Sequence, residues 1–115
     1  MAIQKFEDII VWQKAQDFSV AIYSEFKNNK DFSFNDQIKR ASISISNNIA
    51  EGFDRSSNPD FKRFLYFSLA SNSEVRSMLY LAIKLNFLPE ESAKKLIDSS
   101  NEIARMIFGL IKSLK

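Results

Sequence analysis

The segment "IKRASISISNNIAEGF", residues 38–53, decides the fold, because its two interpretations lead to different classes of protein. Between residues 42 and 46 serine and isoleucine alternate, and that period of two is typical of a half-buried strand. At 100° per residue, however, one apolar stripe continues through all sixteen residues, and only a helix explains the longer pattern. We therefore predict a helix whose small serine residues let a neighbouring helix approach closely. The stripe consists of Ile38, Ala41, Ser42, Ile45, Ile49, Gly52 and Phe53.

Helical periodicity extends over the rest of the chain. The chain has only 2 Gly and 2 Pro residues, and we interpret them as breaks in the helical pattern. We predict four helices at about residues 8–29, 34–56, 59–86 and 89–114, with Asp8 capping the first and Asn58 capping the third. The connections are short, and short connections favour antiparallel neighbours. The expected fold is therefore all-α, an antiparallel up-down four-helix bundle that forms a single domain over residues 1–115.

The composition excludes every kind of site that needs Cys or His, because the 115 residues include neither. A thiol nucleophile, a disulfide, an imidazole base and a His or Cys metal site are therefore absent. No second carboxylate accompanies Glu51, so the second group that acid–base catalysis or a di-metal site would need is missing. We expect no catalytic residue, no metal and no cofactor, and so a protein that is not an enzyme. With no apolar run near ~20 residues and no signal peptide, we expect no membrane partner and a cytoplasmic location.

The two middle helices carry more apolar residues than the core of one bundle uses. Beyond the core stripe, each predicted helix has apolar residues on a second side. Such a second apolar face suggests contact with another copy of the chain. The alternative is a wide core stripe with ordinary surface aromatics. The candidate interface residues are Ile43, Ala50, Tyr66, Leu69 and Tyr80.

Three segments resemble a known family: "FEDIIVWQKA" (6–15), "QIKRASISISNNIAEGF" (37–53) and "RSSNPDFKRFLYFSLASNSEV" (55–75). They are similar to the four-helix bundle proteins encoded in the intervening sequences of bacterial 23S rRNA genes, also called the S23 ribosomal protein family. The likeness covers nearly the whole chain, and "NIAEG" is its most specific part. The chain departs from the family pattern at Ala70, where Gly is favoured, and at Ser73, where a basic residue is common. Asn72 stands where Leu is frequent, so a core position is expected to be polar here.

The resemblance implies an assembly as well as a fold. It implies a ring-shaped homopentamer, and kinship with the accessory protein of diversity-generating retroelements, a basic pentamer that binds a reverse transcriptase and nucleic acid. The partners to be expected are therefore further copies of this chain, RNA or DNA, and a nucleic-acid-processing protein. The activity of the rRNA-associated family itself is not established, so the resemblance specifies the fold better than the function.

Several polar side chains in and around these motifs have spacings that predict contact. Glu51 and Arg55 lie four apart in the order that favours an ion pair, and Arg63 and Glu74 lie on one side of the third helix. Together with Asn48, we expect these residues to form a polar network at or near the helix seam. A structural role in setting register is favoured over a ligand site.

Nucleic-acid binding, if present, is expected to rest on phosphate contacts that are weak in each subunit and repeated around a ring. In the competing interpretation, Arg55 and Arg63 are neutralised by Glu51 and Glu74, and the protein is a docking scaffold without nucleic-acid contacts. The candidate phosphate-binding residues are Lys39, Arg40, Arg55, Lys62 and Arg63.

Overall fold

The computed structural model describes residues 3–114, so residues 1, 2 and 115 of the expected domain lie outside the described range. A short 3-10 helix, η1 (Phe6–Asp8), precedes four α-helices: α1 (Ile10–Glu25), α2 (Phe32–Phe53), α3 (Asn58–Lys84) and α4 (Glu90–Ser113). The prediction for residues 42–46 is confirmed, because they lie in the middle of α2 and no strand occurs in residues 3–114. The predicted all-α four-helix bundle is likewise confirmed.

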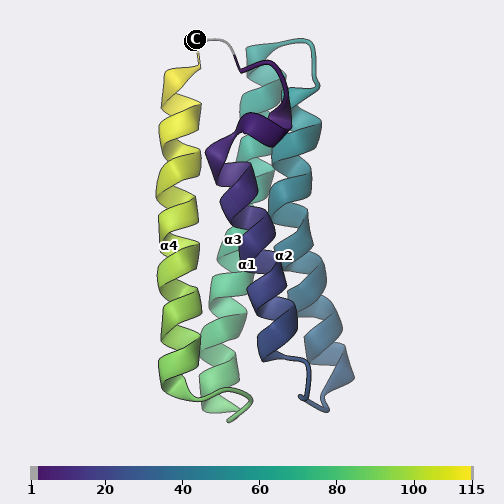
Figure 1. Ribbon diagram of the computed structural model, residues 1–115, viewed down its shortest axis with the longest axis vertical. Coiled ribbons are helices and arrows are strands. Elements are labelled where there is room, and N and C mark those ends of the chain that lie inside the picture. Colours follow the sequence, from purple (N-terminus) through teal and green to yellow (C-terminus); the bar gives the residue numbers. More distant parts are fainter. Residues whose placement is uncertain (1–2, 115) are drawn as a thin grey trace.

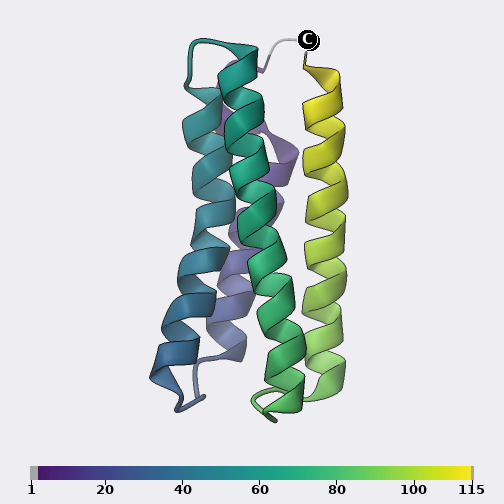
Figure 2. The ribbon, with the colours of Figure 1, turned by 180° about the vertical axis from the view of Figure 1, so that it is seen from behind.

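The four helices run antiparallel to their neighbours along a bundle 44 Å long (Figure 1). Helix α1 packs against α2 and α4, and helix α3 packs against the same two helices. Helices α1 and α3 are therefore diagonal to each other. Figure 1 shows α1 in front, whereas α3 is in front when the molecule is seen from behind (Figure 2). The outer sides of α1 and α3 consequently face in opposite directions.

The core is built from the predicted helical stripes. Ile38, Ile45 and Ile49 of α2 are completely buried, as the sixteen-residue pattern requires. Each of the other three helices contributes an equally continuous stripe, with residues three and four apart on its inner side. The buried apolar residues of those helices include Val11, Ala15, Phe18, Ile22, Leu65, Val75, Leu79, Ala82, Ala93, Leu96, Ile103 and Ile107.

Small residues bring α2 and α3 close together, as predicted from the serines of the opening segment. The Ser68 hydroxyl donates to the carbonyl of Ile45 across the two helices at 2.8 Å. At the end of α2, a Cβ added to Gly52 would lie 2.6 Å from the Cβ of Phe64. No larger residue fits there without movement of the helices, so Gly52 sets their separation beside the α2–α3 turn.

A buried polar pair joins α3 to α4. The Asn72 side chain donates to the carbonyl of Ser100 at 2.9 Å and accepts from the Ser100 hydroxyl at 2.9 Å. Both residues are almost completely buried, so the polar core position expected from the sequence is confirmed. Because both partners are satisfied only in one alignment of the helices, the pair fixes the register of α3 against α4.

The helix ends depart from the sequence-based prediction: α1 ends at Glu25 instead of about residue 29, α2 covers Phe32–Phe53 instead of about 34–56, and two predicted caps are wrong. Asp8 does not cap α1, because it belongs to η1, and α1 follows Ile9 without a side-chain cap. The cap of α3 is Ser57, whose hydroxyl accepts from the backbone N–H of Asp60, and Asn58 is the first helical residue. The predicted cap and start of α3 were therefore one residue too late, a shift that periodicity alone does not resolve.

Candidate interaction surfaces

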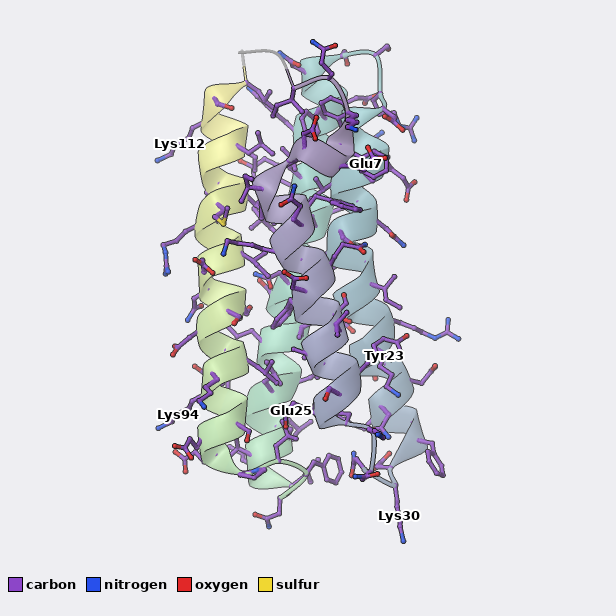
Figure 3. The ribbon with its side chains drawn as sticks, in the orientation of Figure 1. Glu7, Tyr23, Glu25, Lys30, Lys94 and Lys112 are labelled. Carbon is purple, nitrogen blue, oxygen red and sulfur yellow. The ribbon has the colours of Figure 1, made fainter. Side chains whose placement is uncertain are left out.

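An uncharged hollow lies on the outer side of the α1–α2 pair, and we call it the α1–α2 groove. Its volume is about 380 Å³. Val20 is 69% exposed, and Tyr23 and Ile43 are also exposed, so the groove presents apolar surface to the outside. Figure 3 shows Tyr23 on this side of the molecule, between α1 and α2. The lining residues are Gln16, Ser19, Val20, Tyr23, Ile43 and Ser46.

The α1–α2 groove also contains an unsatisfied polar atom. The hydroxyl of Ser19 is buried and has no hydrogen-bond partner, the one such side-chain atom in residues 3–114. The neighbouring Ser46 hydroxyl, by contrast, accepts from the Gln16 amide at 3.1 Å. Because an unpaired buried hydroxyl is costly, the Ser19 hydroxyl marks a position where a further group would be stabilising.

A second uncharged surface follows the outer side of α3, and we call it the α3 strip. Two charged residues of α3 lie between the ends of the strip, and the side chains of both are hydrogen-bonded to a neighbouring helix. Glu74 accepts from Gln37 of α2 at 3.2 Å, and Arg76 donates to Asn101 of α4 at 3.2 Å. The strip between them is therefore free of charge over several turns. Its residues, all exposed, are Tyr66, Ala70, Ser73, Ser77, Tyr80 and Leu81.

The predicted interface residues separate onto these two surfaces. Ile43 lines the α1–α2 groove, whereas Tyr66 and Tyr80, each more than half exposed, belong to the α3 strip. Ala50 of α2 and Leu69 of α3 are half-buried. The sequence-based prediction missed Val20, the most exposed apolar residue of the groove, although its position outside the buried stripe of α1 was a usable signal.

A third surface lies where the α2–α3 turn meets α3, and we call it the arginine–phenylalanine cluster. The guanidinium carbons of Arg55 and Arg63 lie 4.6 Å and 5.0 Å from the ring centroid of Phe64. Arg63 also lies 5.5 Å from the ring centroid of Phe67. The Phe64 and Phe67 rings are 5.5 Å apart in an edge-to-face arrangement. Two cations thus share one aromatic ring.

The other cations proposed to bind phosphate are placed differently. Arg40 is paired with Asp36 at 2.9 Å, and the ammonium of Lys39 lies 4.8 Å from the ring centroid of Tyr23, beside the α1–α2 groove. Lys62 lies one turn from Tyr66 on α3 and therefore belongs to the side of the α3 strip. The structure thus brings together only Arg55 and Arg63 of the five candidates.

The predicted polar network does not form within the single chain. In residues 3–114 the Asn48 amide donates to Ser44, and Arg63 pairs with Asp60 at 3.4 Å. Glu74 instead accepts from Gln37, and Glu51 is exposed without an ion pair. Arg63 prefers Asp60 because a partner three residues away is adjacent, whereas Glu74 is eleven residues or about 16 Å along the helix.

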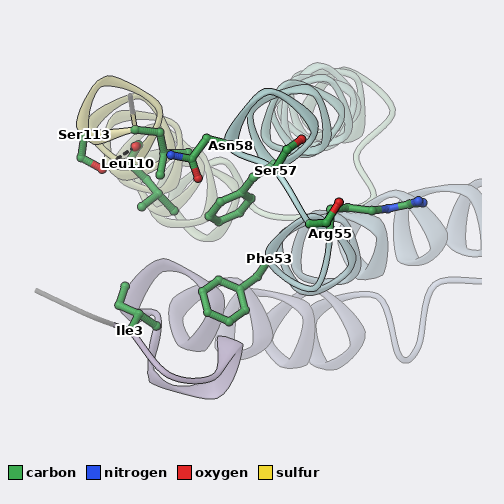
Figure 4. Close-up of a pocket in the computed structure, with 10 residues that line it drawn as sticks. Ile3, Phe53, Arg55, Ser57, Asn58, Leu110 and Ser113 are labelled. Carbon is green, nitrogen blue, oxygen red and sulfur yellow. Dashed lines mark hydrogen bonds between the residues drawn. The ribbon is translucent and has the colours of Figure 1, made fainter.

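A larger hollow of about 530 Å³ opens at the end of the bundle near the α2–α3 turn (Figure 4). Its floor is apolar, with Phe53 and Leu110, and Ser57, Asn58 and Ser113 lie at its rim. The guanidinium of Arg55 extends away from this hollow in Figure 4. Within the described residues no carboxylates cluster in a way that could hold a metal ion, and no helix could cross a membrane.

The architecture places the chain among small antiparallel four-helix bundle proteins. The chain belongs to the 23S rRNA-intervening sequence protein family, whose sequence profile matches residues 7–109. A crystal structure of an S23 ribosomal protein family member of unknown function from Bacteroides thetaiotaomicron VPI-5482 superposes with a TM-score of 0.84. The two are 29% identical, and the similarity covers 89% of this chain and 98% of the other. No curated protein matches the chain.

Proposed function

We propose that this protein is a non-enzymatic, cytoplasmic assembly protein in which copies of the chain join head to tail. The observation that carries the proposal is the presence of two uncharged surfaces on different sides of the bundle: the α1–α2 groove, and the α3 strip on the helix diagonal to α1. A contact between two different surfaces of one chain is heterologous, and heterologous contacts generate rings when the rotation closes. The expected ring is the pentamer implied by the family resemblance.

The chemistry of the two surfaces supports their pairing. The groove lining has no charged residue, and the cores of interfaces are depleted of charge. A tyrosine of the α3 strip offers the groove both an apolar ring and a hydroxyl. That hydroxyl could pair with the buried hydroxyl of Ser19, which has no partner in the described chain. Tyr66 and Tyr80 are the two residues of the strip able to make this contact.

The mass of the protein in solution tests the assembly. At micromolar concentration, light scattering should give five times the 13.3 kDa of one chain. Val20→Asp and Tyr66→Asp should each reduce the mass, because either substitution places a charge in the contact. Phe32→Asp is the matched control: Phe32 is 76% exposed but begins α2, outside both surfaces, so its replacement should leave the mass unchanged. A wild-type protein of 13.3 kDa would contradict the proposal.

A second proposed activity is weak binding of RNA or DNA through phosphate contacts. The observation that favours it is the placement of Arg55, which has no ion pair within residues 3–114, next to Arg63. Repetition of such a site around a ring would raise the avidity. By the same resemblance, the protein partner would be a nucleic-acid-processing protein. Gel-shift titration at rising salt tests this activity, and affinity should fall steeply with salt. If neither RNA nor DNA shifts in the gel at low salt, the docking-scaffold alternative replaces the proposed nucleic-acid binding.

A further inference from the structure

The arginine–phenylalanine cluster has a fixed geometry at its centre. Phe64 is 7% exposed, and its backbone is held beside Gly52, where an added Cβ would lie 2.6 Å from the Cβ of Phe64. The two guanidinium groups therefore rest on an aromatic ring that is itself buried in the seam between α2 and α3. A guanidinium that stacks on a ring keeps its N–H groups free at the edge of its plane.

The positive charge of this cluster is only partly neutralised. Arg63 has one carboxylate partner, Asp60 at 3.4 Å, a pair that is partly exposed and longer than the Arg40–Asp36 contact of 2.9 Å. Arg55 is paired with no carboxylate in the described chain, although Glu51 lies four residues before it. Lys94 shows a closer pairing: the Glu90 carboxylate accepts a hydrogen bond from its ammonium at 3.0 Å and thereby raises the pKa of Lys94.

Beside this charge lies an exposed aromatic surface. The ring of Phe67 is 45% exposed and packs against Phe64, while Arg63 covers part of it. An exposed phenylalanine next to arginine is the combination on which unpaired bases stack, because both aromatic rings and guanidinium planes accept a base face. A base that remains paired inside a duplex does not offer its face to such a ring.

We propose that Arg55, Arg63 and Phe67 form a site for single-stranded nucleic acid, in which the two guanidiniums bind a backbone phosphate and Phe67 stacks on an adjacent base. This inference rests on the proposed nucleic-acid binding and states which form of nucleic acid is recognised. Guanidinium groups suit phosphate because their N–H donors match two phosphate oxygens at once. The recognition depends little on sequence, because every base has a face on which a ring can stack.

Fluorescence anisotropy with the full-length protein tests the site. The probes are a labelled single-stranded oligothymidine, the same oligomer annealed into a duplex, and a labelled oligouridine. Both single strands should bind more tightly than the duplex at equal salt. Phe67→Leu, which keeps an apolar side chain on α3, should weaken single-strand binding roughly 5- to 150-fold and leave duplex binding unchanged. Arg55→Ala and Arg63→Ala should weaken both and lower the salt dependence.

Controls separate this site from general attraction and from loss of structure. Arg105→Ala removes the same charge from the exposed side of α4, the helix diagonal to α2, and should reduce single-strand binding much less than Arg55→Ala. Thermal unfolding and light scattering should show that every variant keeps the fold and the mass of the wild type.

The possible results distinguish the inference from the function on which it rests. Equal binding of single strands and duplex, or normal single-strand binding by Phe67→Leu, overturns the stacking site while phosphate binding stands. No binding of any probe at low salt overturns the proposed nucleic-acid binding as well. Capture of a protein by this cluster without nucleic acid would also overturn the inference, because arginine and phenylalanine are common in protein interfaces.

Discussion

At the scale of single residues, the two glycines of the chain occupy opposite environments. A methyl group at Gly52 would lie 2.6 Å from the Cβ of Phe64, whereas one at Gly109 would meet no atom within 4 Å. Gly52→Ala should lower the free energy of unfolding by about 1–3 kcal/mol, because α2 and α3 must separate. Gly109→Ala should raise it by roughly 0.5–1 kcal/mol, since alanine favours the helix. Urea denaturation followed by circular dichroism measures both.

This pair of substitutions contains its own control. Both substitutions replace glycine by alanine inside a helix, so both gain the same helix propensity. The difference between their free energies of unfolding therefore reports the close contact at Gly52. If Gly52→Ala were as stable as Gly109→Ala, α2 and α3 would not approach as closely as described.

Residue contacts were the least predictable level of the structure. The burial of Asn72 could be predicted, because it stands where the resembling family has leucine. The partner of Arg63 could have been predicted as well, because Asp60 lies three residues away whereas Glu74 lies eleven residues along the helix. The stacking of Arg55 on Phe64 joins two elements and depends on the direction of a side chain, for which periodicity carries no information.

At the scale of helices, periodicity predicted all four elements and their stripes, because burial of one side must repeat every 3.6 residues over the length of a helix. The helix ends were less predictable. The end of α3 shows why: Asn86 adopts a left-handed conformation with φ 59°, and the N–H of Phe87 donates to the carbonyl of Ala82. This hydrogen bond closes the helix by backbone geometry that the hydrophobic pattern does not record.

The register of α3 against α4 should depend on the Asn72–Ser100 pair. Asn72→Ala should lower the free energy of unfolding by about 1–3 kcal/mol, because the Ser100 hydroxyl and carbonyl lose their partner in the core. The double substitution Asn72→Leu with Ser100→Ala should restore most of that loss, since it removes both polar groups. A double-mutant cycle measured by denaturation checks the coupling. Additive effects of the two sites would show that the pair does not hold the helices together.

At the scale of the whole molecule, the sequence predicted an excess of apolar surface but not its distribution. Ile43, Tyr66 and Tyr80 were expected to share one interface. The structure instead places Ile43 in the groove between α1 and α2, and both tyrosines on the outer side of α3, the helix diagonal to α1. Only the packing order of the helices reveals this separation, and the separation is what makes a head-to-tail contact possible.

Mixing two variants tests the head-to-tail contact most directly. One variant carries Val20→Asp and Ile43→Asp in the α1–α2 groove, and the other carries Tyr66→Asp and Tyr80→Asp on the α3 strip. Each alone should have the 13.3 kDa mass of one chain, because each lacks one half of the only contact. Mixed in equal amounts, they should form a complex of one chain of each kind, in which the intact strip of the first occupies the intact groove of the second. Light scattering of the mixture should therefore give twice 13.3 kDa, whereas a mixture that stays at 13.3 kDa, or a single variant that dimerises alone, would contradict the head-to-tail assembly.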